Sequence, residues 1–428
     1  MVIAPIDPGR IEDLRKLLGS MTQIDRPGMA DSRNALVPFE EFDRLHFARF
    51  MILEDPTAKD LTAYGNAIEK WDTSLVFMGD CDGPVTEFFA HLIAAATPGL
   101  RIIFSHCRSF GPDTNLWRWM HDHEHPPATI YVNRIGRTLK QVHEENALYN
   151  SIESYLGANA PAIAGADPQR IRSGILEFVN SELRAGRLTL TPRETTPPGW
   201  QLRNLAHCLG VPIILLLLSP FLLVSLPFLI YQLRLREKSD PEIAPRPDSA
   251  EGRRLANLED YDVTNQYNAF GTVKPGLLRR WALTFLLWVV NYATRHIYNR
   301  SHLTRITTIH FARWVFLADK TKVFFASNYD GSDESYMDDF INKLGWGLNL
   351  VFGNGVGYPR TNWILCEGTY NEQKFKYFNR RHQQPTEVWY KAYPGLTTFD
   401  LARNELVRAG VQKPAMNDAE TRDWLSLF

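Results

Sequence analysis

The sequence has little cysteine and no excess of charge of either sign. Its four cysteines (Cys81, Cys107, Cys208 and Cys366) are scattered along 428 residues and form no Cys-x-x-Cys pair. This usage is typical of reduced thiols in the cytoplasm rather than of a disulfide framework. The formal net charge is −1. A chain so close to neutrality gives no reason to expect a nucleic-acid partner.

The N-terminus lacks an apolar run. Its opening residues, MVIAPIDPGRIEDL, place prolines and charges where a signal peptide would have its hydrophobic region. We therefore expect no cleavable signal, and we expect the soluble parts of the chain to be cytoplasmic.

Charge is absent from one internal segment, Leu209–Tyr231, for 23 residues. A segment of this length and hydropathy is a candidate for membrane insertion, and a buried core helix is the alternative. Pro212, Pro220 and Pro227 interrupt it, and each removes a backbone donor. Ser219–Pro220 lies near the midpoint, so two short helices in a hairpin and one kinked span both fit the pattern.

A second apolar run, Trp281–Ala293, has 13 residues and is too short to span a bilayer comfortably. Its large side chains fall on one helical stripe, and arginines flank it, which predicts a helix over 279–297 lying in the membrane interface. Basic residues also flank the longer segment on both sides. We therefore expect a monotopic protein with both soluble halves on the cytoplasmic face.

The sequence on the two sides of the apolar segment reads as two copies of one unit. His46–Arg49 and His310–Arg313 share the letters HFAR, and each is followed by an apolar run. Ser74–Gly83 and Lys322–Gly331 both end in Asp-Gly, and 17 positions separate each of these aspartates from a Gly-Leu pair. Several landmarks at constant spacing indicate an internal repeat. The first copy has an insert around Glu54–Asp72.

Each copy predicts strands and helices in one order, which indicates an α+β sandwich with helices on one face. The predicted division is a first repeat with its N-terminal helix (1–157), a helical linker with the membrane segment (158–300), and a second repeat (301–428). The predicted elements of the first copy are strands Leu45–Leu53 and Ser74–Gly79, helix Val85–Ala96, strand Arg101–Ser105, helix Asn115–His121, strand Thr129–Asn133 and a helix from Leu139. Those of the second copy are Ile309–Leu317, Val323–Ser327, Glu334–Leu344, Leu348–Phe352, Gln373–Arg381, Glu387–Ala392 and a helix from Thr398.

Two such units in one chain resemble the ferredoxin-like dimeric α/β barrel, the superfamily of the dye-decolorizing peroxidases and the chlorite-dismutase-like haem proteins. Gly79–Gly83 resembles the peroxidase GxxDG motif, whose acid assists peroxide cleavage above the haem. Ser327–Gly331 keeps only the Asp-Gly of that motif. The resemblance implies a haem cofactor and peroxidase-like chemistry.

The candidate catalytic residues are Asp330, Arg313, Asp82 and Arg49. The candidate haem ligands are His310, His382 and His106, with His310 also the candidate metal ligand, because imidazole is a common axial ligand. Alternatives stay open for these residues. Asp-Gly is ordinary turn chemistry, the histidines of the two HFAR segments suit a structural task, and the arginines could pair with the aspartates.

The alternating histidines of His121–His125 could bind zinc or iron, or lie in a solvated loop.

Two functions fit these patterns. One is a membrane-associated, haem-dependent oxidoreductase that acts on a lipophilic substrate, with its pocket in the second copy over the sheet of His310 and Arg313. The other is a non-enzymatic lipid-binding or interaction scaffold. The expected partners are a lipid membrane and a lipophilic small molecule, and a second copy of the chain is a further candidate.

Overall fold

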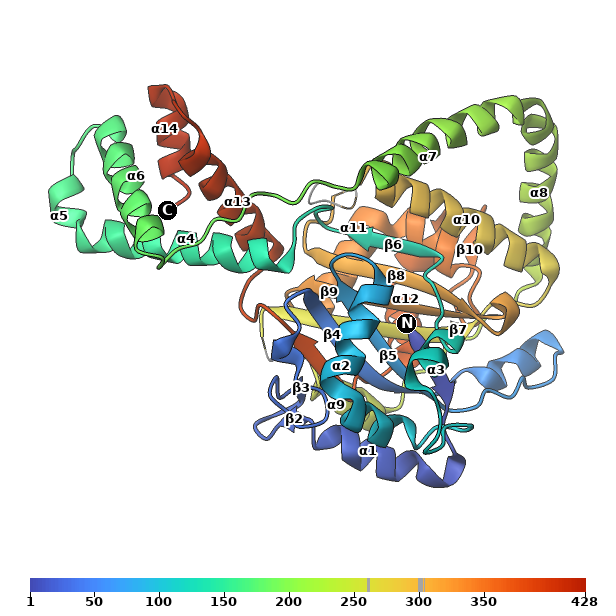
Figure 1. Cartoon of the computed structure of the whole chain (residues 1–428). Helices are drawn as coiled ribbons and strands as arrows, with labels where there is room; N and C mark the ends of the chain where they lie inside the picture. Colours follow the sequence, from blue (N-terminus) through green and yellow to red (C-terminus); the bar gives the residue numbers. More distant parts are fainter. Residues whose placement is uncertain (260–261, 299–302, 304) are drawn as a thin grey trace. The chain divides into compact units, whose positions relative to one another are not determined.

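A six-stranded mixed sheet and a four-stranded antiparallel sheet form the centre of this mixed α+β chain (Figure 1). The computed structural model describes residues 1–259, 262–298, 303 and 305–428. Two compact units emerge, Met1–Ile135 with Thr196–Ala392 and Gly136–Thr195 with Tyr393–Phe428. Each unit is discontinuous in sequence, a division different from the three consecutive domains expected.

The six-stranded sheet has the order β1-β5-β4-β12-β3-β2. Its strands are β1 (Val2–Pro5), β5 (Ser74–Cys81), β4 (Leu45–Leu53), β12 (Val388–Lys391), β3 (Arg26–Ala30) and β2 (Thr22–Gln23). Only the pair of β12 and β3 is parallel. The four-stranded sheet has the order β6-β8-β9-β7, with β6 (Thr129–Val132), β8 (Ile309–Leu317), β9 (Lys322–Asp330) and β7 (Thr264–Thr272). A short pair, β10 (Thr361–Asn362) and β11 (Cys366–Glu367), stands apart.

Each sheet is completed by a strand from the other end of the chain. β12 pairs with β4, where Trp389 lies opposite Arg49, and β6 pairs with β8, where Ile130 lies opposite Arg313. In both long antiparallel pairs the register shifts beside the histidine of the HFAR segment. Neither sheet can therefore reach its full width until the two ends of the chain have come together.

Helices cover the outer face of each sheet, and apolar side chains fill the space between the sheets. α1 (Ile11–Gly19), α2 (Val85–Phe104) and α3 (Leu116–Asp122) share a buried core with β4 and β5. α10 (Leu277–His296), α11 (Asp333–Phe352) and α12 (Glu372–His382) share another with β7, β8 and β9. A third core, between the sheets, includes Met51, Met78, Val315 and Phe324. The layers are thus helices, sheet, sheet and helices.

The predicted strands Arg101–Ser105 and Leu348–Phe352 are wrong, because these residues end the long helices α2 and α11. Leu100, Ile103 and Phe104 are buried at helical spacing and continue the apolar face that begins earlier in α2. The helix also runs on through Pro98. The predicted strand Leu45–Leu53 is confirmed with the same bounds.

The second compact unit is helical. It consists of α4 (Leu139–Ala158), α5 (Ala160–Ile163), α6 (Pro168–Arg184), α13 (Thr398–Gln412) and α14 (Asp418–Leu425). Capping boxes at Thr138 and Thr397 begin α4 and α13, and each uses the side chain three residues on to satisfy backbone donors. The unit has its own apolar core, which includes Leu148, Ile175 and Trp424.

The uncharged segment forms parts of two helices that meet at Leu218. α7 (Pro198–Leu217) ends there and α8 (Ser219–Ser239) begins, and α9 (Ser249–Ala256) follows further on. Of the described helices, α2 and α7 are long and apolar enough to cross a membrane, with 44% and 6% of their most apolar windows buried. α2 owes its apolar composition to its place in the core of the six-stranded sheet, whereas α7 is exposed.

The close approach of α2 to the loop before β4 can be tested at Gly99. A Cβ atom there would lie 1.9 Å from the backbone oxygen of Leu36. We expect Gly99→Ala to lower the free energy of unfolding by about 1–3 kcal/mol, as overpacking does. The matched control is Gly252→Ala in α9, where a Cβ would meet nothing within 4 Å. Urea unfolding should show no loss in the control, and equal stability of the two variants would contradict this packing.

Candidate functional site

Two buried arginines join the sheets from the inside. Arg49 of β4 donates to the side-chain oxygen of Asn268 at 2.6 Å and to that of Asn328. Arg313 of β8 donates to the Asp80 carboxylate and, at 3.2 Å, to the Gly79 carbonyl. Asn328 also donates to Asp80 at 2.9 Å. The two candidate catalytic arginines thus lie in one network that crosses from sheet to sheet.

Burial sets the electrostatics of this network. Loss of solvent lowers the pKa of Arg49 and of Arg313 to about 9, so both stay protonated at neutral pH. Buried charges persist in proteins when hydrogen bonds and counter-charges satisfy them, as Asp80 and the two asparagines do here. Substituting one partner would leave the other charged and buried. The arrangement holds the sheets together.

The candidate catalytic aspartates bond the histidines of the HFAR segments. His46 Nε2 lies 3.0 Å from Asp82 Oδ1, and His310 Nε2 lies 2.7 Å from Asp330 Oδ1. The His310 ring packs edge-on against Phe47 of the other sheet. Each histidine at the register shift of one strand is therefore tied to the end of the neighbouring strand, an arrangement that sequence reasoning left open as a structural task.

Sequence reasoning missed Asp80, Asn268 and Asn328. Asp80 and Asn328 occupy the same position in the two repeated strands, two residues before each Asp-Gly aspartate. A polar side chain inside an otherwise apolar strand was the available signal. Asn268 lies in β7, a strand that was not predicted.

His106 and His382 lie outside the network of arginines. His106 follows α2, and its Nδ1 is 3.0 Å from the Ile102 carbonyl oxygen. His382 ends α12 on the outer face of the four-stranded sheet, and its Nδ1 is 2.8 Å from the Phe378 carbonyl oxygen. The structure therefore does not bring the three candidate haem ligands together.

A cavity of about 50 Å³ lies beside His382, between β7 and β9 on one side and α10, α11 and α12 on the other. Its walls are apolar and aromatic, and include Gly271, Leu283, Phe325, Phe340, Phe352 and Phe378. His382 is 3% exposed, and its Nε2 has no hydrogen-bond partner among the residues that the structure describes. Burial lowers the pKa of His382 to about 4, so the ring is neutral near pH 7.

A similar histidine contact lies at the end of α3, beside the six-stranded sheet. His123 makes the same contact as His382, with Nδ1 2.8 Å from the Trp119 carbonyl oxygen. The Trp119 ring stacks on His123 and packs at 4.7 Å from Phe104. Phe378 stands where Trp119 would be, and the smaller ring leaves space beside His382.

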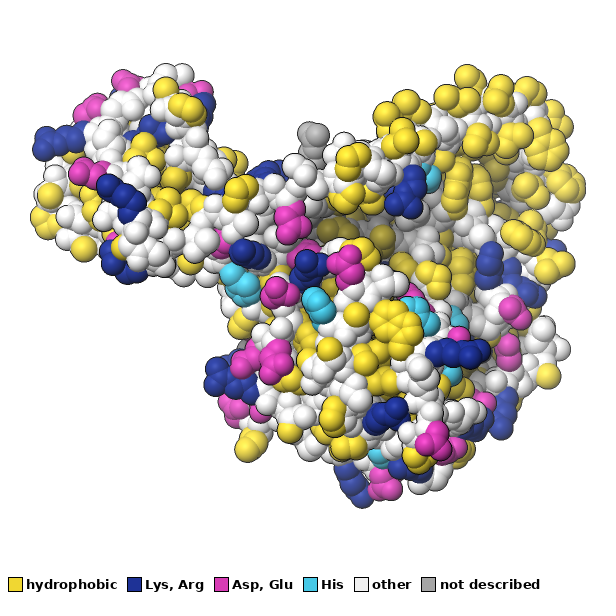
Figure 2. Space-filling model, viewed as in Figure 1, with side chains coloured by type: hydrophobic (Ala, Val, Ile, Leu, Met, Phe, Trp, Pro, Cys, Tyr) yellow, Lys and Arg dark blue, Asp and Glu magenta, His cyan; other side chains and the backbone are white. Residues whose placement is uncertain are grey.

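The apolar side chains of α7 and α8 form the largest exposed hydrophobic surface that Figure 2 shows, over the helices at its upper right. Leu217 is 74% exposed and Val224 is 79% exposed. Other apolar residues of these helices that are exposed include Leu209, Ile213, Leu216, Phe221, Leu223 and Phe228.

Polar contacts fasten the start of α7 to the C-terminal end of α10. Asn204 accepts a hydrogen bond from Arg295 at 2.6 Å, and the Arg295 guanidinium lies 5.5 Å from the centre of the Trp200 ring. His207 Nδ1 is 2.8 Å from His296 Nε2. These contacts fix the first end of the apolar segment.

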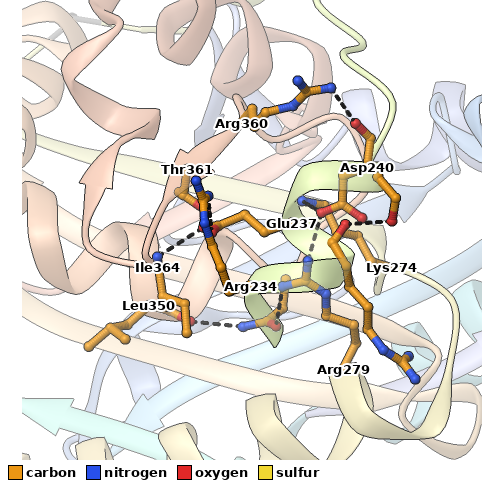
Figure 3. Close-up of polar contacts among 12 residues, drawn as sticks. Arg234, Glu237, Asp240, Lys274, Arg279, Leu350, Arg360, Thr361 and Ile364 are labelled. Carbon is orange, nitrogen blue, oxygen red and sulfur yellow. Dashed lines mark hydrogen bonds and ion pairs between the residues drawn. The ribbon is translucent and has the colours of Figure 1, made fainter. Parts of the chain in front are cut away.

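A buried ionic network fixes the C-terminal end of α8 to the N-terminal end of α10 (Figure 3). Asp240 pairs with Lys274 at 2.8 Å and with Arg279 at 2.7 Å. Glu237 pairs with Arg234 at 2.7 Å, and also accepts from Thr361 and from the backbone of Ile364. Burial lowers the pKa of Lys274 to about 8, and Asp240 opposes that shift.

The described residues include no group of three or more His, Cys, Asp and Glu side chains that could hold a metal ion. His121 Nδ1 lies 2.9 Å from the Trp117 carbonyl oxygen, so its ring is turned back on its own helix. The chain matches no protein-family model, and no curated protein or solved structure is similar to it. The site must therefore be interpreted from its own geometry.

The depressed pKa of His382 predicts a loss of stability in acid. In the unfolded chain the His382 imidazole has a pKa near 6.5, whereas in the folded protein its pKa is about 4. We expect this group to lower the free energy of unfolding by about 3 kcal/mol as the pH falls from 6.5 to 4.

Urea unfolding at several pH values checks this prediction. His382→Gln should flatten the pH dependence in that window, and the control His123→Gln should leave it unchanged. A wild-type slope that survives in His382→Gln would show that His382 is not the group responsible.

Proposed function

We propose that this protein is a monotopic membrane protein that holds a small lipophilic molecule in the cavity beside His382. The observation that carries the proposal is the exposed, uncharged segment Leu209–Tyr231, whose two ends are both fastened to the same compact unit. A contiguous apolar surface of this extent marks a membrane or protein contact. Lipid is the occupant that fits a segment without one charged or strongly polar side chain.

The lengths of the two arms support insertion from one side. The apolar part of α7, Leu209–Leu217, has nine residues and is about 14 Å long. The apolar part of α8, Ser219–Tyr231, has 13 residues and is about 20 Å long. The hydrocarbon core of a bilayer is about 30 Å thick, so the uncharged part of either helix alone is too short to cross it. The bend at Leu218 would lie inside the bilayer, with both ends of the apolar segment at the same membrane surface.

The residues that flank the two ends of the apolar segment suit a membrane surface. Arg203 precedes the apolar segment, and Arg236 and Lys238 follow it. Glu237 and Asp240, at the C-terminal end of α8, are buried in ion pairs. Cationic flanks favour the anionic cytoplasmic leaflet. On α10, Trp281 is 64% exposed, and its stripe continues through Phe285 and Val289. That stripe suits a helix lying in the interface, with Leu283 and Leu287 turned into the core.

A duplicated ferredoxin-like fold is part of the same proposal. The order β1-β5-β4-β12 and the order β7-β9-β8-β6 place corresponding strands in corresponding positions. α2 and α11 each have 20 residues and follow the corresponding strands β5 and β9. These matches support two related units that exchange their last strands. They also support placing both units on one side of the membrane, since exchanged strands cannot be separated by a bilayer.

A haem-dependent oxidoreductase is the second candidate, and one observation favours it. His382 has its Nδ1 fixed by a carbonyl and its Nε2 without a partner, as a histidine ligand requires. The cavity does not fit a haem, however. Its volume of about 50 Å³ is far below the roughly 300 Å³ at which ligand pockets begin. Asp330, the candidate acid, is engaged with His310 rather than aimed at His382.

Flotation with lipid vesicles tests membrane attachment. The wild-type protein should float with vesicles that contain anionic lipid, and more weakly with vesicles of phosphatidylcholine alone. Leu217→Asp or Val224→Asp should weaken binding about 100-fold, because a charge in the bilayer core costs about 2.5–3.5 kcal/mol. Ile24→Asp, at an exposed isoleucine in the β2–β3 turn, is the matched control.

The control should bind as the wild type does. The proposal fails if the two α7–α8 variants also float unchanged. It fails equally if the wild type ignores vesicles and instead forms a dimer, measured by light scattering, that the same substitutions dissociate.

A further inference from the structure

We infer that the cavity beside His382 binds a slim, uncharged molecule that donates one hydrogen bond, of the class of alkyl alcohols, with its hydroxyl on His382 Nε2. This inference deepens the proposed function and rests on it for the lipid origin of the ligand. The site is defined by two independent features, an apolar cavity and a buried polar atom that has no hydrogen-bond partner within the described part of the chain.

The tautomer of His382 makes Nε2 an acceptor. Nδ1 lies 2.8 Å from the Phe378 carbonyl oxygen, which only accepts, so the ring hydrogen is on Nδ1. Nε2 then presents a bare lone pair, and an unsatisfied buried acceptor carries a desolvation cost that a donor removes. The ligand must therefore bring an O–H or N–H group to this atom.

Gly271 allows the backbone of β7 to lie close to the edge of the His382 ring. A Cβ atom on Gly271 would lie 2.5 Å from His382 Cδ2 and 3.0 Å from Nε2. Gly271 also lines the cavity, so the backbone of β7 forms the wall nearest to the ring. Any side chain at this position would press on the Cδ2 edge of the His382 ring and displace it.

The size and the charge of the surroundings limit the rest of the ligand. The cavity of about 50 Å³ is smaller than the roughly 150 Å³ that holds benzene, so only a short alkyl alcohol about the size of ethanol fits. A carboxylate is disfavoured, because the walls of the cavity are apolar and a buried charge there would lose its hydration. A neutral alcohol satisfies both limits.

The position of α10 connects this cavity to the proposed membrane surface. Leu283 of α10 lines the cavity, and Trp281 and Phe285 of the same helix are exposed. One helix thus separates the cavity from the surface that would meet lipid. An alcohol dissolved in the bilayer would have to pass only α10 to reach this site.

Two isomeric probes test the inference, ethanol and dimethyl ether, which have the same atoms but differ in the O–H donor. The full-length protein, labelled with ¹⁵N at histidine, is titrated with each while the Nε2 resonance of His382 is followed. That resonance is identified by its loss in His382→Phe. We expect ethanol to shift it and to bind about tenfold more tightly than the ether, the value of one hydrogen bond.

Two variants complete the test. Gly271→Ala should abolish binding of ethanol, because its Cβ would displace the His382 ring, and His123→Phe, at the end of α3, should leave binding unchanged. Equal affinities for alcohol and ether would overturn the inference, as would binding that survives Gly271→Ala or a cavity that takes up neither probe. A Soret band in the purified protein that His382→Phe removes would assign the site to haem instead. Vesicle flotation is independent of all these outcomes, so failure here is distinguishable from failure of the membrane proposal.

Discussion

Both ends of an uncharged helical hairpin are fixed to the two ends of one helix. α7 meets the C-terminal end of α10 through Arg295 and His296, and the foot of α8 meets its N-terminal end through Asp240 and Arg279 (Figure 1). Buried ion pairs cost several kcal/mol to break by removing one partner, so the foot of α8 is not easily released. This attachment places both ends of the apolar segment on the same compact unit.

The exchange of end strands imposes the same condition on the rest of the chain. β6 and β12 each leave the sheet of their own half and complete the other, and Arg49 and Arg313 reach across the space between the sheets. The parts before and after the hairpin therefore share one core. A segment inserted between two halves that depend on each other in this way has to return to its starting side.

Features written in local sequence could be predicted, and features that depend on distant residues could not. The strand Leu45–Leu53 follows from composition and periodicity with its exact bounds, and the helix α10 (Leu277–His296) lies close to the expected 279–297. The ends of α2 and α11 were misread because their apolar residues suit a strand as well as a helix when Pro98 or Gly347 precedes them.

The candidate site shows the same contrast. His382 was a candidate ligand by residue type, but its cavity depends on Gly271 and on the phenyl ring of Phe378. Gly271 lies more than a hundred residues away, in a strand that the sequence did not reveal. Asp80 was not predicted as a site residue, because the Asp-Gly pair two positions later indicated Asp82 instead. Contacts between residues far apart in the sequence, rather than the local sequence pattern, determine the positions of Asp80 and of the cavity beside His382.

The depth of Leu218, at the bend between α7 and α8, tests the monotopic arrangement most directly. In a chain with its four cysteines replaced by serine, Leu218→Cys is bound to sealed vesicles and treated with a membrane-impermeant thiol reagent from each side in turn. Ile24→Cys reports the side of the globular unit. The monotopic account predicts that Ile24→Cys reacts from its own side, while Leu218→Cys reacts from neither side until detergent dissolves the bilayer. Reaction of Leu218→Cys from the side opposite to Ile24→Cys would show that the hairpin crosses the membrane and would contradict the account.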